Sequence, residues 1–264
     1  MKEMLKLILR KFGYEVYRYH PYPTHLENRG EFDYVETETG KYYLPPDATN
    51  DAIAKEIRWN KVFDQHILDI AVEYIKEDSI VLDVGSNFGQ MAIQFAKHVG
   101  QKGMVYAFEA NHYVFRVLEK NIEVNKAHVK AFEGAVHTVS GETLYFPEPD
   151  IATYGTYGSF GIDYVHGLGT PVKSLALDDL DYPLPVSFMK VDIQGGDLMA
   201  LKGARNTINK FRMPIVFEYE FRLEKTLGLR FQDYVDFVDS INYVFYRAPD
   251  NNYVVLPRES CTGK

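Results

Sequence analysis

Residues 81–90, VLDVGSNFGQ, constrain the fold more than any other part of the sequence. A short apolar strand ends in an acid, a turn containing glycine follows, and a helix begins near Gln90. Gly85 allows the backbone to turn tightly and a ligand to approach the main chain, and Gly89 allows the new helix to pack close to the strand. This strand–turn–helix pattern is typical of Rossmann-like folds, in which such a turn lies at the ligand-binding edge of the sheet.

Around this segment, short apolar strands alternate with helical patterns, which predicts a mostly parallel sheet with helices on both faces. We predict strands at 79–84, 103–108, 129–135, 187–191 and 214–220, a short extra strand at 144–146, and helices at 90–99, 112–125, 197–211 and 231–241. Residues 242–247 and 252–257 flank the turn-forming sequence APDN, which predicts a C-terminal antiparallel hairpin. The predicted class is therefore α/β and Rossmann-like.

The first 50 residues are predicted to form an extension before one domain that spans residues 51–264. Apolar residues at helical spacing within residues 4–12 predict a helix that either docks on its own domain or lies on a membrane surface. Residues 32–44 alternate loosely and predict a hairpin. After Asp51, a predicted N-cap, a helical pattern extends to residue 75 as one long helix or two joined helices.

The composition narrows the range of partners. Lys and Arg total 29 against 37 Asp and Glu, a net charge of −8, and no dense basic stripe is present. Such a chain repels phosphate backbones, so nucleic acid is not a predicted partner. The lone cysteine, Cys261, cannot form an intramolecular disulfide, and no apolar run is long enough to span a bilayer. These features favour a cytoplasmic protein and are compatible with a homo-oligomer.

Two acids at predicted strand ends indicate the kind of cofactor. Asp83 precedes the turn, where it would repel a pyrophosphate but attract the ammonium group of an amino acid. Asn87 stands where a dinucleotide-binding loop of the form G-x-G-x-x-G has its second glycine. Glu109 ends the next strand, where an acid can accept hydrogen bonds from both hydroxyls of a ribose. The loop therefore favours S-adenosylmethionine over NAD.

A series of motifs between residues 79 and 220 resembles the FkbM-type methyltransferases, which are small-molecule and sugar O-methyltransferases with the class I methyltransferase fold. The matching stretches are LDVGSNFG at 82–89, FEAN at 108–111, Asn121, Asn125, GAV at 134–136, LDDL at 177–180, MKVDIQGGD at 189–197, LKGA at 201–204 and Glu218. The block at 189–197 is the most specific of these. This block also differs from the family pattern, which usually has an acid at the position of Gln194 and a Glu at the position of Asp197. A glutamine cannot act as a base.

The resemblance implies that residues 51–264 form a methyltransferase domain that binds S-adenosylmethionine. The residues predicted to bind this cofactor are Asp83, Gly85, Ser86, Asn87, Gly89, Glu109, Ala110, Asn111, Ala135 and Asp192. Asp192 is also the first choice for the residue that accepts the proton, with Glu218 on the adjacent strand as the alternative and His166 as a weaker candidate. A divalent ion is compatible with acids at strand ends, but no metal ligand is predicted.

The predicted reaction is transfer of the sulfonium methyl group to a hydroxyl of a small polyhydroxylated acceptor. The resemblance points to a sugar or nucleotide-linked sugar of glycan or polysaccharide biosynthesis. The glycine- and aromatic-rich residues 154–161, YGTYGSFG, are either an ordinary connection or a wall of the acceptor pocket. Two alternative functions stay open. One is a non-catalytic module that binds S-adenosylmethionine, and the other is an NAD-dependent oxidoreductase, which Asp83 and Asn87 disfavour.

Overall fold

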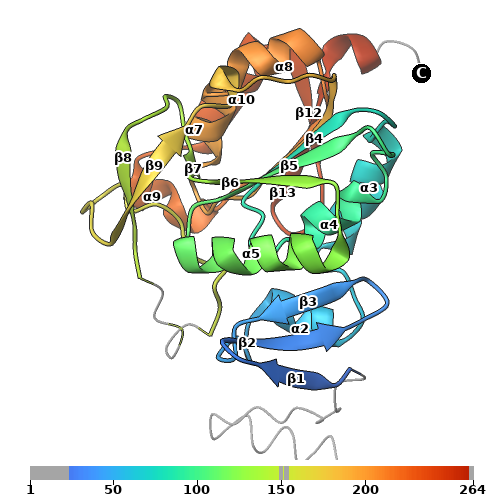
Figure 1. Ribbon diagram of the computed structural model, residues 1–264. Helices are drawn as coiled ribbons and strands as arrows, with labels where there is room; N and C mark the ends of the chain where they lie inside the picture. The colour runs from blue at the N-terminus through green and yellow to red at the C-terminus, as the bar shows by residue number, and fades with distance from the viewer. Residues whose placement is uncertain (1–23, 149–150, 152–154, 262–264) are drawn as a thin grey trace, which may run out of the picture.

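A computed structural model of the chain describes residues 24–148, 151 and 155–261. Its main element is a seven-stranded sheet in the order β12-β13-β11-β10-β4-β5-β6 (Figure 1). The strands are β4 (Ile80–Val84), β5 (Met104–Glu109), β6 (Val129–Glu133), β10 (Val186–Val191), β11 (Ile215–Glu218), β12 (Tyr243–Arg247) and β13 (Asn252–Pro257). Neighbours from β11 to β6 run parallel, and β13 runs antiparallel to both β11 and β12. The predicted α/β class, mostly parallel sheet and C-terminal hairpin are confirmed.

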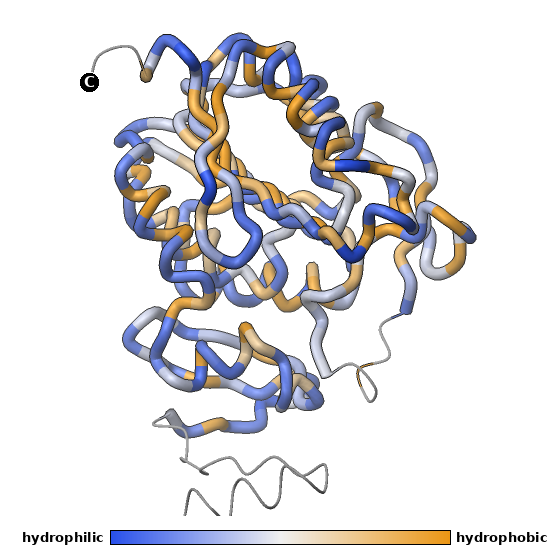
Figure 2. The backbone as a smooth tube through the Cα atoms, turned by 180° about the vertical axis from the view of Figure 1, so that it is seen from behind, coloured by the Kyte–Doolittle hydropathy of each residue, from blue (hydrophilic) through white to orange (hydrophobic). Residues whose placement is uncertain are grey.

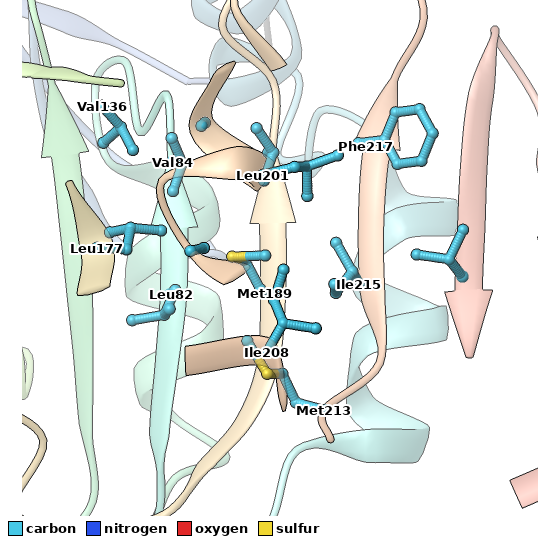
Figure 3. Close-up of a cluster of buried hydrophobic side chains, with 14 of the residues drawn as sticks. Leu82, Val84, Val136, Leu177, Met189, Leu201, Ile208, Met213, Ile215 and Phe217 are labelled. Atoms are coloured by element: carbon cyan, nitrogen blue, oxygen red, sulfur yellow. The ribbon is translucent and has the colours of Figure 1, made fainter. Parts of the chain in front are cut away.

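Helices cover both faces of this sheet, as predicted (Figure 1). One face packs against α3 (Gln65–Tyr74), α4 (Gln90–Ala96) and α5 (His112–Asn125), and the other against α7 (Asp197–Lys202), α8 (Arg205–Phe211) and α10 (Phe231–Ser240). Figure 2 shows that the chain through the sheet is predominantly hydrophobic, which suits strands buried on both faces. In Figure 3, Leu82, Met189 and Ile215 of the strands lie against Leu201 and Ile208 of α7 and α8.

A small antiparallel sheet packs beside α5 (Figure 1). It contains β1 (Leu26–Arg29), β2 (Phe32–Glu36) and β3 (Lys41–Leu44), and α2 (Ala52–Arg58) follows it. Asn121 and Asn125 of α5 each exchange two hydrogen bonds with the backbone of β3, at Tyr43 and Lys41 respectively. The two amides therefore serve β3 as a partner strand would, because each offers one donor and one acceptor. The hairpin predicted within residues 32–44 is confirmed as β2 and β3.

The helical pattern after Asp51 forms two helices, α2 and α3, which is one of the two predicted alternatives. Asp51 caps α2, as predicted, by accepting a hydrogen bond from Ala54 N at 2.9 Å. The stretch 197–211 forms α7 and α8, because Gly203 passes so close to a neighbouring loop that a Cβ would lie 2.0 Å from the His137 carbonyl oxygen. The carboxylate of Asp178, in a short helix formed by residues 177–179, caps α8 by accepting from the backbone N–H groups of Asn206 and Thr207. Because Asp178 lies 28 residues before Asn206, this cap depends on the tertiary structure.

In the part of the chain that the structure describes, the remaining elements are a third sheet and four short helices. A third sheet contains β7 (Ala135–Val136), β8 (Thr143–Phe146) and β9 (Thr170–Leu175), and the short helices are η1 (Leu177–Asp179), η2 (Phe221–Leu223), α9 (Glu224–Leu227) and η3 (Arg258–Cys261). β8 confirms the predicted extra strand, whereas β1 and β9 were not predicted. The helix predicted within residues 4–12 lies outside the described residues. Among the residues from 24 onward that the structure describes, no helix has both the length and the apolar character to cross a bilayer.

Candidate functional site

A cavity of about 450 Å³ opens at the carboxyl ends of β4, β5, β10 and β11. The chain continues from β4 to β5 on one side and reaches β10 and β11 on the other, so the strand order reverses between β4 and β10. Parallel sheets bind ligands at this reversal, and pockets of roughly 300–1,000 Å³ are typical of small-molecule sites. Seven of the residues predicted for cofactor binding line the cavity, namely Gly85, Ser86, Asn87, Glu109, Ala110, Ala135 and Asp192.

The turn after β4 forms the floor of the cavity. Gly85 has a φ of 82°, and a Cβ at this position would lie 1.9 Å from the backbone oxygen of Asp192. The N–H groups of Gly85 and Ser86 both donate to the carbonyl oxygen of Phe108, at 3.0 and 2.9 Å. Asn87 also has a positive φ, 49°, a conformation that asparagine tolerates better than most residues. The turn therefore brings the ends of β4, β5 and β10 within contact distance, and only glycine fits at position 85.

Glu109 lies at the end of β5 with its carboxylate on the cavity wall. One oxygen accepts a hydrogen bond from Asn87 N at 3.0 Å, and the other accepts from Asn111 N at 2.8 Å. Burial raises the pKa of Glu109 to about 7, although the backbone donors oppose that shift. A carboxylate has about four lone-pair sites, so each oxygen keeps acceptor capacity for a hydroxyl group.

Three residues predicted to bind the cofactor do not line the cavity. Asp83 is fully buried beneath it, with one carboxylate oxygen 3.7 Å from Lys190 Nζ. Gly89 precedes α4 at a φ of 83°, where a Cβ would lie 2.5 Å from a Leu118 methyl carbon. Asn111 caps α5, and its side chain accepts from two backbone N–H groups. These three residues lie behind the cavity wall and support the residues that form it.

The other end of the cavity is built from side chains that contact one another. Asp192 follows β10, and its carboxylate is 27% exposed and accepts from Gln194 Nε2 at 3.3 Å. The same amide nitrogen donates to Glu218 Oε2 at 2.9 Å, so Gln194 joins the two carboxyl groups. Arg222 donates to Gln194 Oε1 at 2.7 Å and pairs with Glu220 at 2.8 Å. The residue that departs from the family pattern is thus the centre of this network.

Two acids at this end hold protons more strongly than usual. Burial raises the pKa of Glu218 to about 9, and the charges of Asp192 and Glu220 add to the effect. Burial also raises the pKa of Asp197 to about 7, with Asp192 contributing. At neutral pH, Glu218 therefore keeps its proton. It can donate a hydrogen bond, but it cannot accept a proton until it loses its own.

His166, the weaker candidate base, does not reach the cavity. Its side chain is 71% exposed, and its Nδ1 lies 3.5 Å from Asp163 Oδ1. The backbone N–H of His166 also donates to Asp163, within a turn beside β9. The structure thus brings Asp192 and Glu218 together and leaves His166 apart.

The loop that follows position 154 closes one side of the cavity, and Tyr154 itself lies outside the described residues. Thr156 and Tyr157 line the cavity and are held by a single buried carboxylate, that of Asp51. Asp51 Oδ2 accepts from Thr156 Oγ1 and Tyr157 N, both at 2.9 Å, and its other oxygen caps α2. The Tyr157 hydroxyl donates to Asp47 at 2.9 Å. The segment around α2 therefore fixes this wall.

Several polar wall residues were missed by the sequence analysis. They are Asp64, Lys190, Arg222, Asp250 and Asn252. Glu220, which the sequence offers with Asp192 and Glu218 as an acid at a strand end, also lines the cavity. Lys190 stood inside the most specific motif, so its signal was present, whereas Asp64 and Asp250 are separated by most of the chain and carried none. Asp64, His66 and Asp250 offer ligand atoms within 4.8 Å of one another, but nothing else in the described residues points to a bound ion.

Comparison with known proteins adds to this geometry. The sequence profile described as "Methyltransferase FkbM domain" matches residues 83–245. The hexuronic acid methyltransferase AglP of Haloferax volcanii is 29% identical over 161 residues, which cover 58% of this chain and 61% of that protein. The chain thus spans about three fifths of the length of this relative.

Two crystal structures also align. The FkbM methyltransferase of Methylobacillus flagellatus aligns at 16% identity and a TM-score of 0.44, over 80% of this chain and 56% of that one. The fibrillarin of Aeropyrum pernix aligns at 10% identity and a TM-score of 0.43, over 88% and 96% respectively. The profile match covers more than half of the chain, with the cavity residues from Gly85 to Glu218 inside it. The chain therefore belongs to the methyltransferase FkbM domain family.

Proposed function

We propose that this protein is an S-adenosylmethionine-dependent O-methyltransferase whose acceptor is a sugar hydroxyl, with hexuronic acids as the first class to test. Family membership supports methyl transfer, and it favours this function over the NAD-dependent alternative. The name of the relative AglP supports an acidic sugar as the acceptor. The observation that carries the proposal is one cavity with a ribose-type acid, Glu109, at one end and the paired carboxyl groups of Asp192 and Glu218 at the other.

The residues on the wall fit this cofactor. Glu109 would accept the ribose hydroxyls, because each of its oxygens keeps acceptor capacity beyond the backbone N–H that it binds. Gly85, Ser86 and Asn87 line the cavity as a turn that would face the amino-acid end of the cofactor, and Ala135 lines it with a small side chain. The acids at the far end suit a positively charged sulfonium. When bound, S-adenosylmethionine supplies a methyl group that is activated by this charge.

Asp192 is the proposed proton acceptor. A sugar hydroxyl is a weak acid, so its proton must leave as the new oxygen–carbon bond forms, and a carboxylate within hydrogen-bond reach lowers that barrier. Asp192 is partly exposed on the wall, beside the turn that would hold the cofactor. Glu218 is the poorer base because its raised pKa keeps it protonated at neutral pH. Glu218 would instead orient the acceptor by donating a hydrogen bond.

The test is a methyl-transfer assay on uronic acids, neutral sugars and nucleotide-linked sugars, with release of S-adenosylhomocysteine as the readout. In Asp192→Asn, kcat should fall by about a hundredfold or more while the cofactor Kd stays close to that of the wild type. Asp236→Asn, the same change on the exposed side of α10, is the matched control. Full turnover in Asp192→Asn would remove the base assignment. Cofactor binding by the wild type without turnover on any acceptor would favour the non-catalytic alternative.

A further inference from the structure

Lys190 is a charged residue on a face of the sheet whose neighbouring side chains are apolar. It lies on β10 directly opposite Asp83 of β4, in the register that pairs these two parallel strands. Val81 and Phe188, at neighbouring positions with the same side-chain direction, belong to the apolar core beneath α3 and α4. Lys190 and Asp83 thus place two charges side by side within that face, at the point where the strand order reverses. Departures from an apolar pattern at a binding edge commonly mark function.

The ammonium group of Lys190 contacts three oxygens from three parts of the site. Nζ lies 3.3 Å from the backbone oxygen of Gly85, 3.3 Å from Asp192 Oδ2 and 3.7 Å from Asp83 Oδ1. Its side chain is only 8% exposed. Burial by itself would lower the pKa of Lys190, but the carboxylates of Asp192 and Asp83 outweigh burial and raise it. Lys190 therefore remains a cation.

Neutralising Asp83 accounts for only part of this arrangement. Neither carboxylate oxygen of Asp83 has a hydrogen-bond partner among the described residues, and Lys190 approaches it only to 3.7 Å. The closer carboxylate is that of Asp192, which is partly exposed to the cavity and needs no buried cation for its own solvation. The ammonium group of Lys190 thus lies closer to Asp192, the residue proposed to accept the proton, than to the buried Asp83. The remaining oxygen of Asp192 is held by Gln194, at 3.3 Å.

We propose that Lys190 is a positioning residue, which holds the Asp192 carboxylate in place for methyl transfer and ties it to the cofactor-binding turn through the Gly85 carbonyl. The inference rests on the proposed function. A carboxylate with one oxygen on Lys190 and the other on Gln194 cannot rotate freely. Without Lys190, Asp192 loses its fixed orientation and the turn loses its link to β10. We therefore expect kcat to fall by a larger factor than the cofactor Kd or the acceptor KM changes.

The experiment is a double-mutant cycle in the background of Asp83→Asn, which removes the buried negative charge and keeps the shape. In this background Lys190→Met leaves no unpaired charge behind, so the variants are expected to fold, and thermal unfolding checks this. Relative to Asp83→Asn alone, adding Lys190→Met should lower kcat by at least about tenfold, while the cofactor Kd and the acceptor KM change by less than about threefold. Lys202→Met, on the exposed side of α7, is the matched surface control.

The decisive comparison adds Asp192→Asn to both members of the pair. If Lys190 acts through Asp192, loss of Lys190 should cost little more once Asp192 is already absent, which single-turnover transfer of labelled methyl can measure. An equal loss with and without Asp192 would overturn the inference and leave the proposed function standing. Failure of the variant to fold although Asp83 is neutral would also overturn it, since Lys190 would then be structural. A wild type that transfers no methyl group would overturn both.

Discussion

The two ends of the cavity are built in different ways. At the end proposed to hold the ribose, called the ribose end, Glu109 is held by two backbone N–H groups, and Gly85 brings three strand ends together through main-chain contacts. At the end proposed to hold the acceptor, called the acceptor end, the side chains of Asp192, Gln194 and Glu218 bind one another. A site made of backbone depends on a few local conformations, whereas a site made of side chains depends on which elements the fold brings together. The first can therefore be read from a motif, and the second follows only from the tertiary structure.

The distribution of charge also differs between the ends. The ribose end has one acid on its wall, Glu109, whereas the acceptor end collects acids from distant segments: Asp64, Asp192, Glu218, Glu220 and Asp250. Burial raises the pKa of Glu218, and the nearby charges of Asp192 and Glu220 raise it further. Both ends should therefore respond to pH, because burial also raises the pKa of Glu109 to about 7, whereas changes in backbone geometry should affect mainly the ribose end.

The largest effect is expected from Gly85→Ala at the ribose end. A Cβ would lie 1.9 Å from the Asp192 carbonyl oxygen at a φ of 82°, so the turn must move. We expect a loss of about 3 kcal/mol or more in the free energy of unfolding, and cofactor binding too weak to detect by calorimetry. Gly141→Ala is the control, because its φ of 88° is similar and nothing lies within 4 Å of its Cβ position. The control should lose only about 1–2 kcal/mol. Equal losses would contradict the close-approach argument.

The next effect concerns the loop that closes the cavity. Asp51→Ala removes the cap of α2 and both hydrogen bonds that hold Thr156 and Tyr157. We expect about 2–4 kcal/mol less stability in denaturant unfolding, together with a raised acceptor KM, because the wall loosens. Asp178→Ala is the matched control, since that residue caps α8 with both oxygens, and α8 packs on the other face of the sheet. An unchanged acceptor KM in Asp51→Ala would make the loop a mere connector.

Glu109→Gln tests the ribose end without a change in side-chain size. The amide keeps one acceptor oxygen but turns a donor toward a backbone N–H, either that of Asn87 or that of Asn111. Cofactor affinity in calorimetry should fall by about ten- to a hundredfold, or about 1.5–3 kcal/mol. At saturating cofactor, kcat should stay close to that of the wild type. Glu133→Gln at the end of β6 is the control, and a comparable drop there would argue against a specific role for Glu109.

The smallest effect is a pH dependence of stability at the acceptor end. Because burial beside Asp192 and Glu220 raises the pKa of Glu218 above its ordinary 4.5, the folded state holds this proton more tightly than the unfolded chain does. The contribution of Glu218 to stability is therefore full below about pH 4.5 and is lost as the pH rises through the raised pKa. In Glu218→Gln this loss is absent, so the Tm of the wild type should fall relative to the variant by on the order of a few degrees from pH 5 to pH 9. A constant Tm difference would show that Glu218 does not titrate in this range.

Local sequence patterns predicted most elements because those elements depend on local rules. The Asp51 cap, the hairpin at β12 and β13 and the strands of the sheet each follow from periodicity or turn chemistry. The predictions were wrong where distant contacts intervene. The stretch 197–211 looks continuous in sequence, but it is divided at Gly203, where the chain passes a loop, and Asp178 caps the second half. β9 pairs with β7 and β8, and neither partner could be inferred from its own six residues.

By itself, the sequence determined the α/β class, the family and the cofactor-type turn, because a glycine, an acid and an apolar strand at fixed spacing leave few alternatives. The tertiary structure decided which of the predicted residues face a ligand. It buried Asp83 against Lys190 and carried His166 out into solvent. It also brought Gln194 between two carboxyl groups that lie on different strands. The physical reason is that burial and side-chain contact depend on strand register and loop path, which residues far apart in the chain set together.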